Sequence, residues 1–212
     1  MSGLDTLIAK SLNSIIRESF DKNTVEKIEK RLYEKYGVNI TQSIEDFYKL
    51  DSVLREFFGG GVMKLEKQLL ENVFNLEKPR YENRNWIAIK DSYLTKLILE
   101  SFGDDDKKNI LNTVLGEPRI ISDILNICKI PQTSGYRKIK SLIQDGLLIT
   151  KDLITTSDGK MVNKYKSLFE NVQIMIKKDK VIIEVQIARE FVKDSSIMQV
   201  IKSLDSHLIA ME

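Results

Sequence analysis

Residues 119–148 form the most informative stretch of the chain, and they read RIISDILNICKIPQTSGYRKIKSLIQDGLL. Apolar residues at helical spacing predict two helices separated by a short turn at Pro131. The second helix opens with small polar residues and ends at Asp145-Gly146, a typical helix stop. Two helices joined by so short a turn form a helix-turn-helix, in which the second helix enters the DNA major groove. This stretch therefore predicts a local fold and a nucleic-acid partner together.

The second helix of this pair is expected to have one apolar and one polar face. Gly135 lies on the apolar face, where a glycine allows the two helices to approach closely. Thr133 is the expected N-cap. We expect Arg137 to read a base and Lys140 to contact a phosphate. The candidate DNA-contacting residues of this helix are Gln132, Thr133, Ser134, Tyr136, Arg137, Lys138 and Lys140, with Lys138 at the flank.

The distribution of charge supports this interpretation, although the formal net charge of the whole chain is only +2. Residues 1–85 hold 14 basic and 14 acidic side chains. Residues 129–166 hold eight basic and three acidic side chains, a net charge of +5. Phosphate binding depends on such local clustering of cations rather than on the charge of the whole chain.

Beyond Gly146 the apolar period changes from that of a helix to that of a strand. β-Branched residues flank Asp158-Gly159, a strong signal for a hairpin. A second hairpin is predicted over residues 172–187, with its turn at 177–180. The order of three helices and a hairpin over residues 105–168 is that of a winged helix-turn-helix. Its wing carries three further candidate DNA-contacting residues, Lys160, Lys164 and Lys166.

The first 76 residues predict helices only. Thr24 is the expected N-cap of the second helix, a third helix is expected from about residue 41 to 57, and a fourth over 62–75. The polar segment 77–85 is the expected linker. We therefore predict a mainly α protein with a small antiparallel β component. Its predicted parts are a helical domain at 1–80 for oligomerisation or signal and partner binding, a winged helix-turn-helix domain with an extra hairpin at 86–187, and a C-terminal helix at 188–212.

The C-terminal helix is expected to run from Ser195 or Ser196 to about Ala210. Its apolar positions follow the spacing of a narrow coiled-coil seam. Such a seam forms either a dimer contact or a surface that packs back on its own chain, and the spacing favours neither. The residues of the seam are Ile197, Ile201, Leu204 and Leu208.

Other functional classes find little support in the sequence. Cys128 and His207 are the only residues of their kinds, too few for the usual structural zinc site. The glycines at 59–61 lack the Lys-Ser/Thr of a phosphate-binding loop. We therefore expect no enzyme, no metal and no cofactor. No apolar run is long enough to span a membrane, the N-terminus lacks the pattern of a signal peptide, and a single cysteine suits a reducing compartment, so we expect a cytoplasmic protein.

Several segments resemble a known family. GDDDKKNIL, ISDIL, IPQTSGYRKIKSLIQDGLL and TTSDGKMVNKYKSLF look like the winged helix-turn-helix of archaeal transcriptional regulators in the arsenical-repressor-like (ArsR-type) group. KRLYEKYGVNITQSIEDFYKLDSVLREFFGGG resembles the helical segment that begins two-domain regulators of ammonia-oxidising archaea. The resemblance implies DNA binding by the helix at Thr133–Asp145 and usually a homodimer. Metal-sensing members carry clusters of Cys and His, which this sequence lacks, so metal sensing is not implied.

The combined hypothesis is a cytoplasmic, homodimeric transcription regulator that binds double-stranded DNA. Its N-terminal domain would bind a protein or small-molecule partner. The alternative is a winged helix that serves as a protein-interaction module of the transcription apparatus, without sequence-specific DNA binding.

Overall fold

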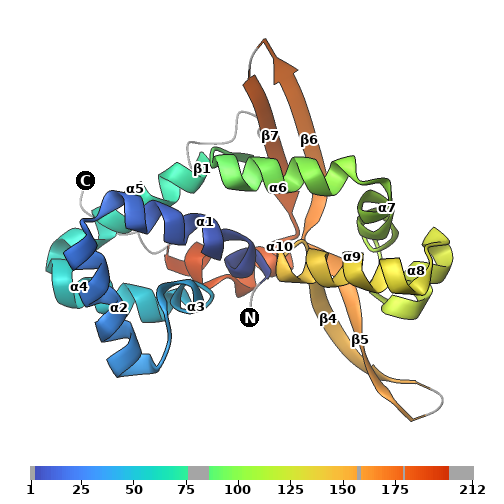
Figure 1. Cartoon of the computed structure of the whole chain (residues 1–212), viewed down its shortest axis with the longest axis horizontal. Helices are drawn as coiled ribbons and strands as arrows, with labels where there is room; N and C mark the ends of the chain where they lie inside the picture. Colours follow the sequence, from blue (N-terminus) through green and yellow to red (C-terminus); the bar gives the residue numbers. More distant parts are fainter. Residues whose placement is uncertain (1–2, 76–85, 157–158, 179, 201–212) are drawn as a thin grey trace.

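The computed structural model describes residues 3–75, 86–156, 159–178 and 180–200. These residues form mainly helices, together with two small antiparallel sheets, which confirms the general fold class predicted from the sequence (Figure 1). The buried apolar residues of the N-terminal helices and of the later elements belong to one continuous cluster.

The N-terminal region is helical, as predicted, but three of its boundaries differ from expectation. Asp21, not Thr24, is the N-cap of the second helix, because the extended backbone of Asp21 lets its side chain accept from the Thr24 N–H. The expected third helix is two helices, and the Phe47 N–H at the start of the second one donates to Ser196 Oγ, 149 residues away. The bounds are α1 Gly3–Ser19, α2 Lys22–Tyr36, α3 Ile40–Ile44, α4 Phe47–Phe58, the 3₁₀ turn η1 Gly59–Gly61 and α5 Val62–Val73.

The third difference is at the end of α5, where a strand replaces the last helical residues expected. Phe74 and Asn75 form β1, which pairs with β2, Trp86–Ile89. The pairing partner of β1 lies beyond the expected linker, so local periodicity could not reveal it. The antiparallel sheet continues to β7, Lys180–Ile187, and then to β6, Phe169–Lys177.

The second sheet is three-stranded and belongs to the segment of the helix-turn-helix. Its order is β3-β5-β4, and all its pairs are antiparallel. Both hairpins predicted from the sequence are present, and they project in opposite directions (Figure 1). The strand bounds are β3 Arg119–Ile120, β4 Leu148–Thr155 and β5 Met161–Ser167; the helices of this half are α6 Ser92–Gly103, α7 Asp105–Thr113, α8 Ile121–Cys128 and α9 Gln132–Gln144.

The C-terminal part contains a short helix that the sequence pattern does not predict, α10, Arg189–Asp194. A further helix then begins at Ser196, as expected, and continues to the end of the described residues at Val200. Ile197 is fully buried, so this end of the predicted seam packs into the protein's own core. The remaining seam residues, Ile201, Leu204 and Leu208, lie outside the described residues.

Helix α1 connects the N-terminal region with the rest of the protein. Asp5 is buried and accepts hydrogen bonds from the Ser196 N–H and hydroxyl, each at 2.8 Å, and from the Ser195 hydroxyl. At the start of α1, Gly3 lies against the Ile149 side chain of β4. The predicted domain boundaries at residues 80 and 86 flank a segment outside the described residues, and the regions on either side of it share a core.

Candidate nucleic-acid interface

Helix α9 is the centre of the candidate interface, and its buried face fixes it against α8. Ile139 and Leu142 are buried, and Gly135 lies beside Leu125. A Cβ built on Gly135 would come within 2.3 Å of Leu125 Cδ2, a distance that no side chain tolerates. The expected close approach of the two helices at this glycine is therefore confirmed.

Lys138 fixes a second side of α9. Its Nζ lies 2.6 and 2.7 Å from the two carboxylate oxygens of Asp104 and 3.0 Å from Asp106 Oδ2. Asp104 is also the N-cap of α7, because it accepts from the Lys107 N–H at 3.0 Å. Lys138 hydrogen-bonding lowers the pKa of Asp104, and the same bond raises the pKa of Lys138. Lys138 thus connects α9 to α7 and does not extend outward.

The C-terminal end of α9 is held by α1. Gly146 follows the helix with a φ of 73°, in the left-handed region that favours glycine. A Cβ at this position would lie 2.7 Å from both the Gly3 carbonyl oxygen and the Leu7 nitrogen. Lys10 of α1 also approaches the Asp145 carboxylate at 3.7 Å. The N-terminal region therefore contacts the helix end directly through its backbone.

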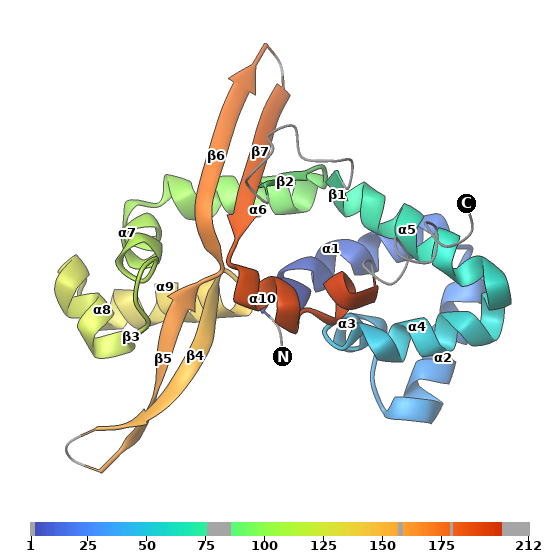
Figure 2. The same ribbon diagram turned by 180° about the vertical axis from the view of Figure 1, so that it is seen from behind.

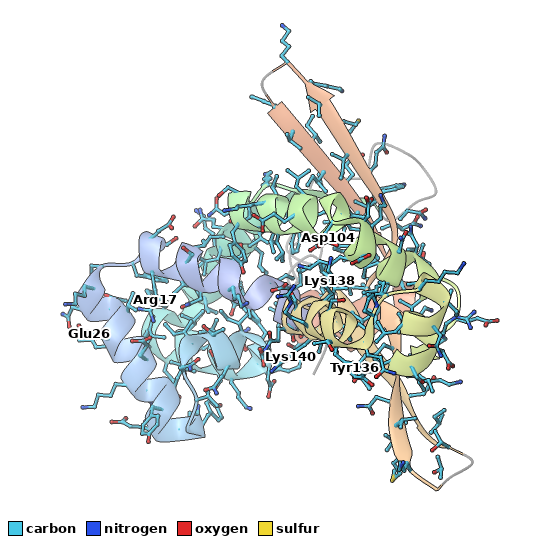
Figure 3. All side chains as sticks on the ribbon, turned by 45° about the vertical axis from the view of Figure 1, so that its right-hand side comes forward. Arg17, Glu26, Asp104, Tyr136, Lys138 and Lys140 are labelled. Atoms are coloured by element: carbon cyan, nitrogen blue, oxygen red, sulfur yellow. The ribbon has the colours of Figure 1, made fainter. Side chains whose placement is uncertain are left out.

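The side of α9 away from Lys138 is open to solvent. Figure 3 shows Tyr136 and Lys140 on this side and Lys138 directed toward Asp104. Tyr136 is 50% exposed, and Arg137 and Lys140 are exposed as well. Neither Arg137 nor Lys140 forms an ion pair with any residue that the structure describes. We refer to Gln132, Thr133, Tyr136, Arg137 and Lys140 as the open face of α9.

One expectation about the first turn of α9 was wrong. Thr133 is not the N-cap, because the helix already begins at Gln132, after Pro131, and no side chain caps it. Ser134 is only half-exposed, and its hydroxyl donates to the Pro131 carbonyl at 3.1 Å. With Pro131 at the N-cap position, the helix starts two residues earlier than it would with a threonine cap at 133.

The β4–β5 hairpin divides its lysines between tip and base. Lys160 lies exposed near the tip, and the half-buried Lys164 pairs across the ladder with Asp152. Lys166 lies at the base, where its Nζ is 3.0 Å from Glu190 of α10. Lys151 binds the same carboxylate at 2.6 Å. The hydrogen bond from Lys151, followed by that from Lys166, lowers the pKa of Glu190.

The anchoring residues were missed as a group by sequence reasoning. Neither Asp104 nor Glu190 was expected to bind a lysine. Each acid meets its lysine across a separation of 24 residues or more, and no local pattern signals such a contact. Lys138 and Lys166, which were expected to face DNA, therefore have intramolecular partners.

Besides Asp5, the described part of the N-terminal region contains a second buried carboxyl group. Glu66 of α5 is completely buried, and neither of its oxygens accepts a hydrogen bond from the described residues. Burial, and then the charge of Asp51, raises the pKa of Glu66 to about 8. Asp51 itself accepts two hydrogen bonds from the Arg55 Nε at 2.8 and 2.9 Å. At neutral pH Glu66 is therefore mainly protonated, and in that form it can donate to Asp51.

Over the described part of the chain, no group of three or more His, Cys, Asp and Glu side chains is arranged to hold a metal ion. Cys128 is partly buried, with its Sγ 3.2 Å from Thr113 Oγ1. Among the same residues, no helix has both the length and the hydropathy to cross a membrane.

The chain matches no protein-family model, no curated protein and no solved structure. Conclusions about function therefore depend on the residues and their geometry.

Proposed function

We propose that this protein is a transcription regulator that binds double-stranded DNA through a winged helix-turn-helix. Helices α7, α8 and α9 would be its three helices, β3 its short strand and β4–β5 its wing. The order of these elements and the β3-β5-β4 sheet support this assignment. The N-terminal helices would then report a signal to α9 through the contact of α1 with Gly146.

The open face of α9 is the observation that carries the proposal. The helix is held by Leu125, by Asp104 and by the backbone of α1, so its remaining side is presented in a fixed orientation. In the major groove Arg137 would donate two hydrogen bonds to a guanine, and Lys140 would contact a phosphate. Tyr136 would bond a base edge or the backbone.

The wing would extend this interface along the DNA backbone. Lys160 and Lys164 are its proposed phosphate contacts. We leave Lys138 and Lys166 out of the interface, because breaking their ion pairs would leave Asp104 and Glu190 without their cations.

We further propose that the regulator is a homodimer and acts in the cytoplasm. A two-fold dimer would place two copies of α9 in successive major grooves, about 34 Å apart. A protein or a small molecule bound by the N-terminal helices would alter this spacing or the orientation of α9. The family resemblance of the sequence supports the dimer. The excess of basic over acidic side chains in residues 129–166 supports DNA as the ligand.

The direct test is binding of the full chain to a pool of genomic double-stranded DNA fragments over a series of salt concentrations. Lys140→Ala should weaken binding to all fragments and reduce the salt slope by about one unit. Arg137→Ala should reduce discrimination between fragments by about 1–3 kcal/mol at the base pair that it reads.

Lys30→Ala is the matched control, because Lys30 is an exposed helical lysine of α2, outside the proposed interface. It should leave the affinity and the salt slope unchanged. If the parent does not bind DNA, or if all three variants bind alike, α9 is not a recognition helix. The same open face would then be examined as a protein-binding surface.

A further inference from the structure

Among the described residues, the apolar face of the β6–β7 hairpin is covered only near its base. Ile183 and Val185 of β7 are buried, but Ile176 is 77% exposed, and Val181, its partner across the ladder, is 42% exposed. Ile174 is exposed on the same face. Figure 2 shows the hairpin extending beyond α6, away from the β4–β5 wing. Large apolar side chains at the end of a projecting hairpin indicate a contact surface.

The outer edge of β6 is also open. The sheet order β1-β2-β7-β6 places β6 at one edge, with no further strand beside it among the residues described. Residues 171–176 carry no charge and no proline, the usual devices that prevent strands from pairing at an exposed edge. The lysines at 177, 178 and 180 follow this stretch and do not interrupt it.

We propose that the edge of β6 pairs with β6 of a second copy of this chain, so that the two sheets become one continuous antiparallel sheet. The register follows from the hairpin. Lys177 pairs with Lys180 next to the turn and bonds to β7. In an antiparallel ladder every second residue then bonds to β7, and the backbone groups of the residues between them face the free edge. Val172, Ile174 and Ile176 then direct their N–H and C=O groups outward. Pairing Ile174 with its own symmetry mate aligns these three residues with the corresponding residues of the second copy.

The charges at the ends of β6 are complementary in the same register. Glu170 is exposed at the base of β6, and Lys178 lies at the tip of the hairpin. With Ile174 on the two-fold axis, Glu170, at the register shift near the base of β6, would come near Lys178, in the turn at the tip of the other copy's hairpin. A second copy is therefore a better occupant than an unrelated strand, because one sequence supplies the hydrogen-bonding edge, the apolar centre and both charges.

This surface is separate from the proposed DNA interface. The two hairpins project in opposite directions, so pairing through β6 leaves the β4–β5 wing free (Figure 1). The proposal specifies the homodimer named under the proposed function, but it depends on the hairpin and not on DNA binding. It can therefore be tested in the absence of DNA.

The test is sedimentation equilibrium of the full chain over a wide range of concentrations. The parent should be a dimer, and Ile176→Lys should raise the dimer dissociation constant by about tenfold or more, because it places a charge in the apolar centre. Leu153→Lys is the matched control, since Leu153 is 56% exposed on the other hairpin. It should leave the dissociation constant unchanged. Circular dichroism would verify that each variant is folded.

A charge exchange tests the register itself. Glu170→Lys and Lys178→Glu should each weaken the dimer by about threefold to tenfold, and the double variant should recover most of the loss. Arg137→Ala with Lys140→Ala should dimerise like the parent, whether or not the protein binds DNA.

Three results would overturn the proposal. The first is a parent that stays monomeric at all concentrations. The second is a dimer that Ile176→Lys does not weaken. The third is a dimer that dissociates only with Leu204→Lys, which would assign the contact to the predicted C-terminal seam.

Discussion

Helices α2 and α9 are alike in sequence pattern, but the fold uses their cations differently. Each is amphipathic and is followed by a glycine with positive φ. On α2, Arg31 and Lys35 both bind Glu56 of α4, each at 2.6 Å, and their hydrogen bonds lower the pKa of Glu56 to about 2. On α9, Arg137 and Lys140 have no such acid among the described residues. The nearby acid, Asp104, binds Lys138 instead.

This difference shows that a basic helix presents free positive charge only when the neighbouring acids pair with other cations. Such a helix is then a candidate binding surface. Helix α2 carries five basic side chains and α9 carries three, yet four of the five on α2 pair with acids of the N-terminal region. The open face of α9 keeps its charge because its anchoring contacts lie on other sides of the helix. Five substitutions, in four experiments, test this contrast and the buried acid of α5, from the largest expected effect to the smallest.

The largest effect is expected where the two helices end. Gly146→Ala should cost about 3 kcal/mol or more, because its Cβ would meet the backbone of α1 at 2.7 Å and its φ is unfavourable. Gly37→Ala, at the end of α2, meets nothing within 4 Å and should cost only about 1 kcal/mol for its positive φ. Urea unfolding of both variants measures the two free energies. Equal losses would show that α1 does not hold the end of α9.

The next effect concerns Glu66, the buried acid of α5. Because its pKa is raised from 4.5 to about 8, the folded protein binds the proton more tightly than the unfolded chain. Stability should therefore fall as the pH rises from about 5 to about 8. Glu66→Gln should remove this dependence and stabilise the protein at pH 8 by about 1–2 kcal/mol. Thermal unfolding at a series of pH values measures it, and an unchanged pH profile would contradict the assignment.

A smaller effect is expected for the anchor of α9. Asp104→Asn retains an N-cap for α7 but removes the charge that binds Lys138. The loss should be below about 1 kcal/mol, because both side chains are partly exposed to solvent. The pKa of Asp104 is lowered in the folded protein, so this contribution is present above its ordinary pKa and is lost as the pH falls. Unfolding measured at neutral and acidic pH should show the parent and the variant converging in acid.

The smallest effect is expected on α2. Glu56→Gln releases Arg31 and Lys35 from their shared acid, and it should change stability only slightly, because the three side chains are solvent-exposed. It should leave the affinity for DNA fragments close to that of the parent. If Glu56→Gln raised the DNA affinity by as much as Lys140→Ala lowers it, unpaired cations would be sufficient for DNA binding on either helix. The distinction between α2 and α9 would then be wrong.

The sequence predicted those features that depend on neighbours along the chain. Helix α9, its stop at Asp145-Gly146, the close approach at Gly135 and both hairpins follow from periodicity and turn chemistry. The open face of α9 follows from the same period, and Tyr136, Arg137 and Lys140 are exposed as that spacing requires.

The features that were missed depend on contacts between distant segments. Lys138 looks like its neighbours in sequence, and only the positions of Asp104 and Asp106, more than 30 residues earlier, direct it inward. Phe74 ends an apolar helical pattern, and it forms a strand because β2 offers it an edge. The N–H of Phe47 begins a new helix beside a serine 149 residues later. Packing between distant segments, and not local propensity, determines each of these three features.

The hydrogen bonds of Asp5 have a consequence for the order in which the protein can be completed. Burial raises the pKa of this carboxyl, and its partners, Ser195 and Ser196, lie 190 and 191 residues further along the chain. During synthesis α1 leaves the ribosome long before these serines exist. Until Ser195 and Ser196 have been synthesised, Asp5 must keep its contact with water, and the side of α1 that carries it cannot be buried. The core around α1 can therefore be completed only after the segment that follows β7 has been translated.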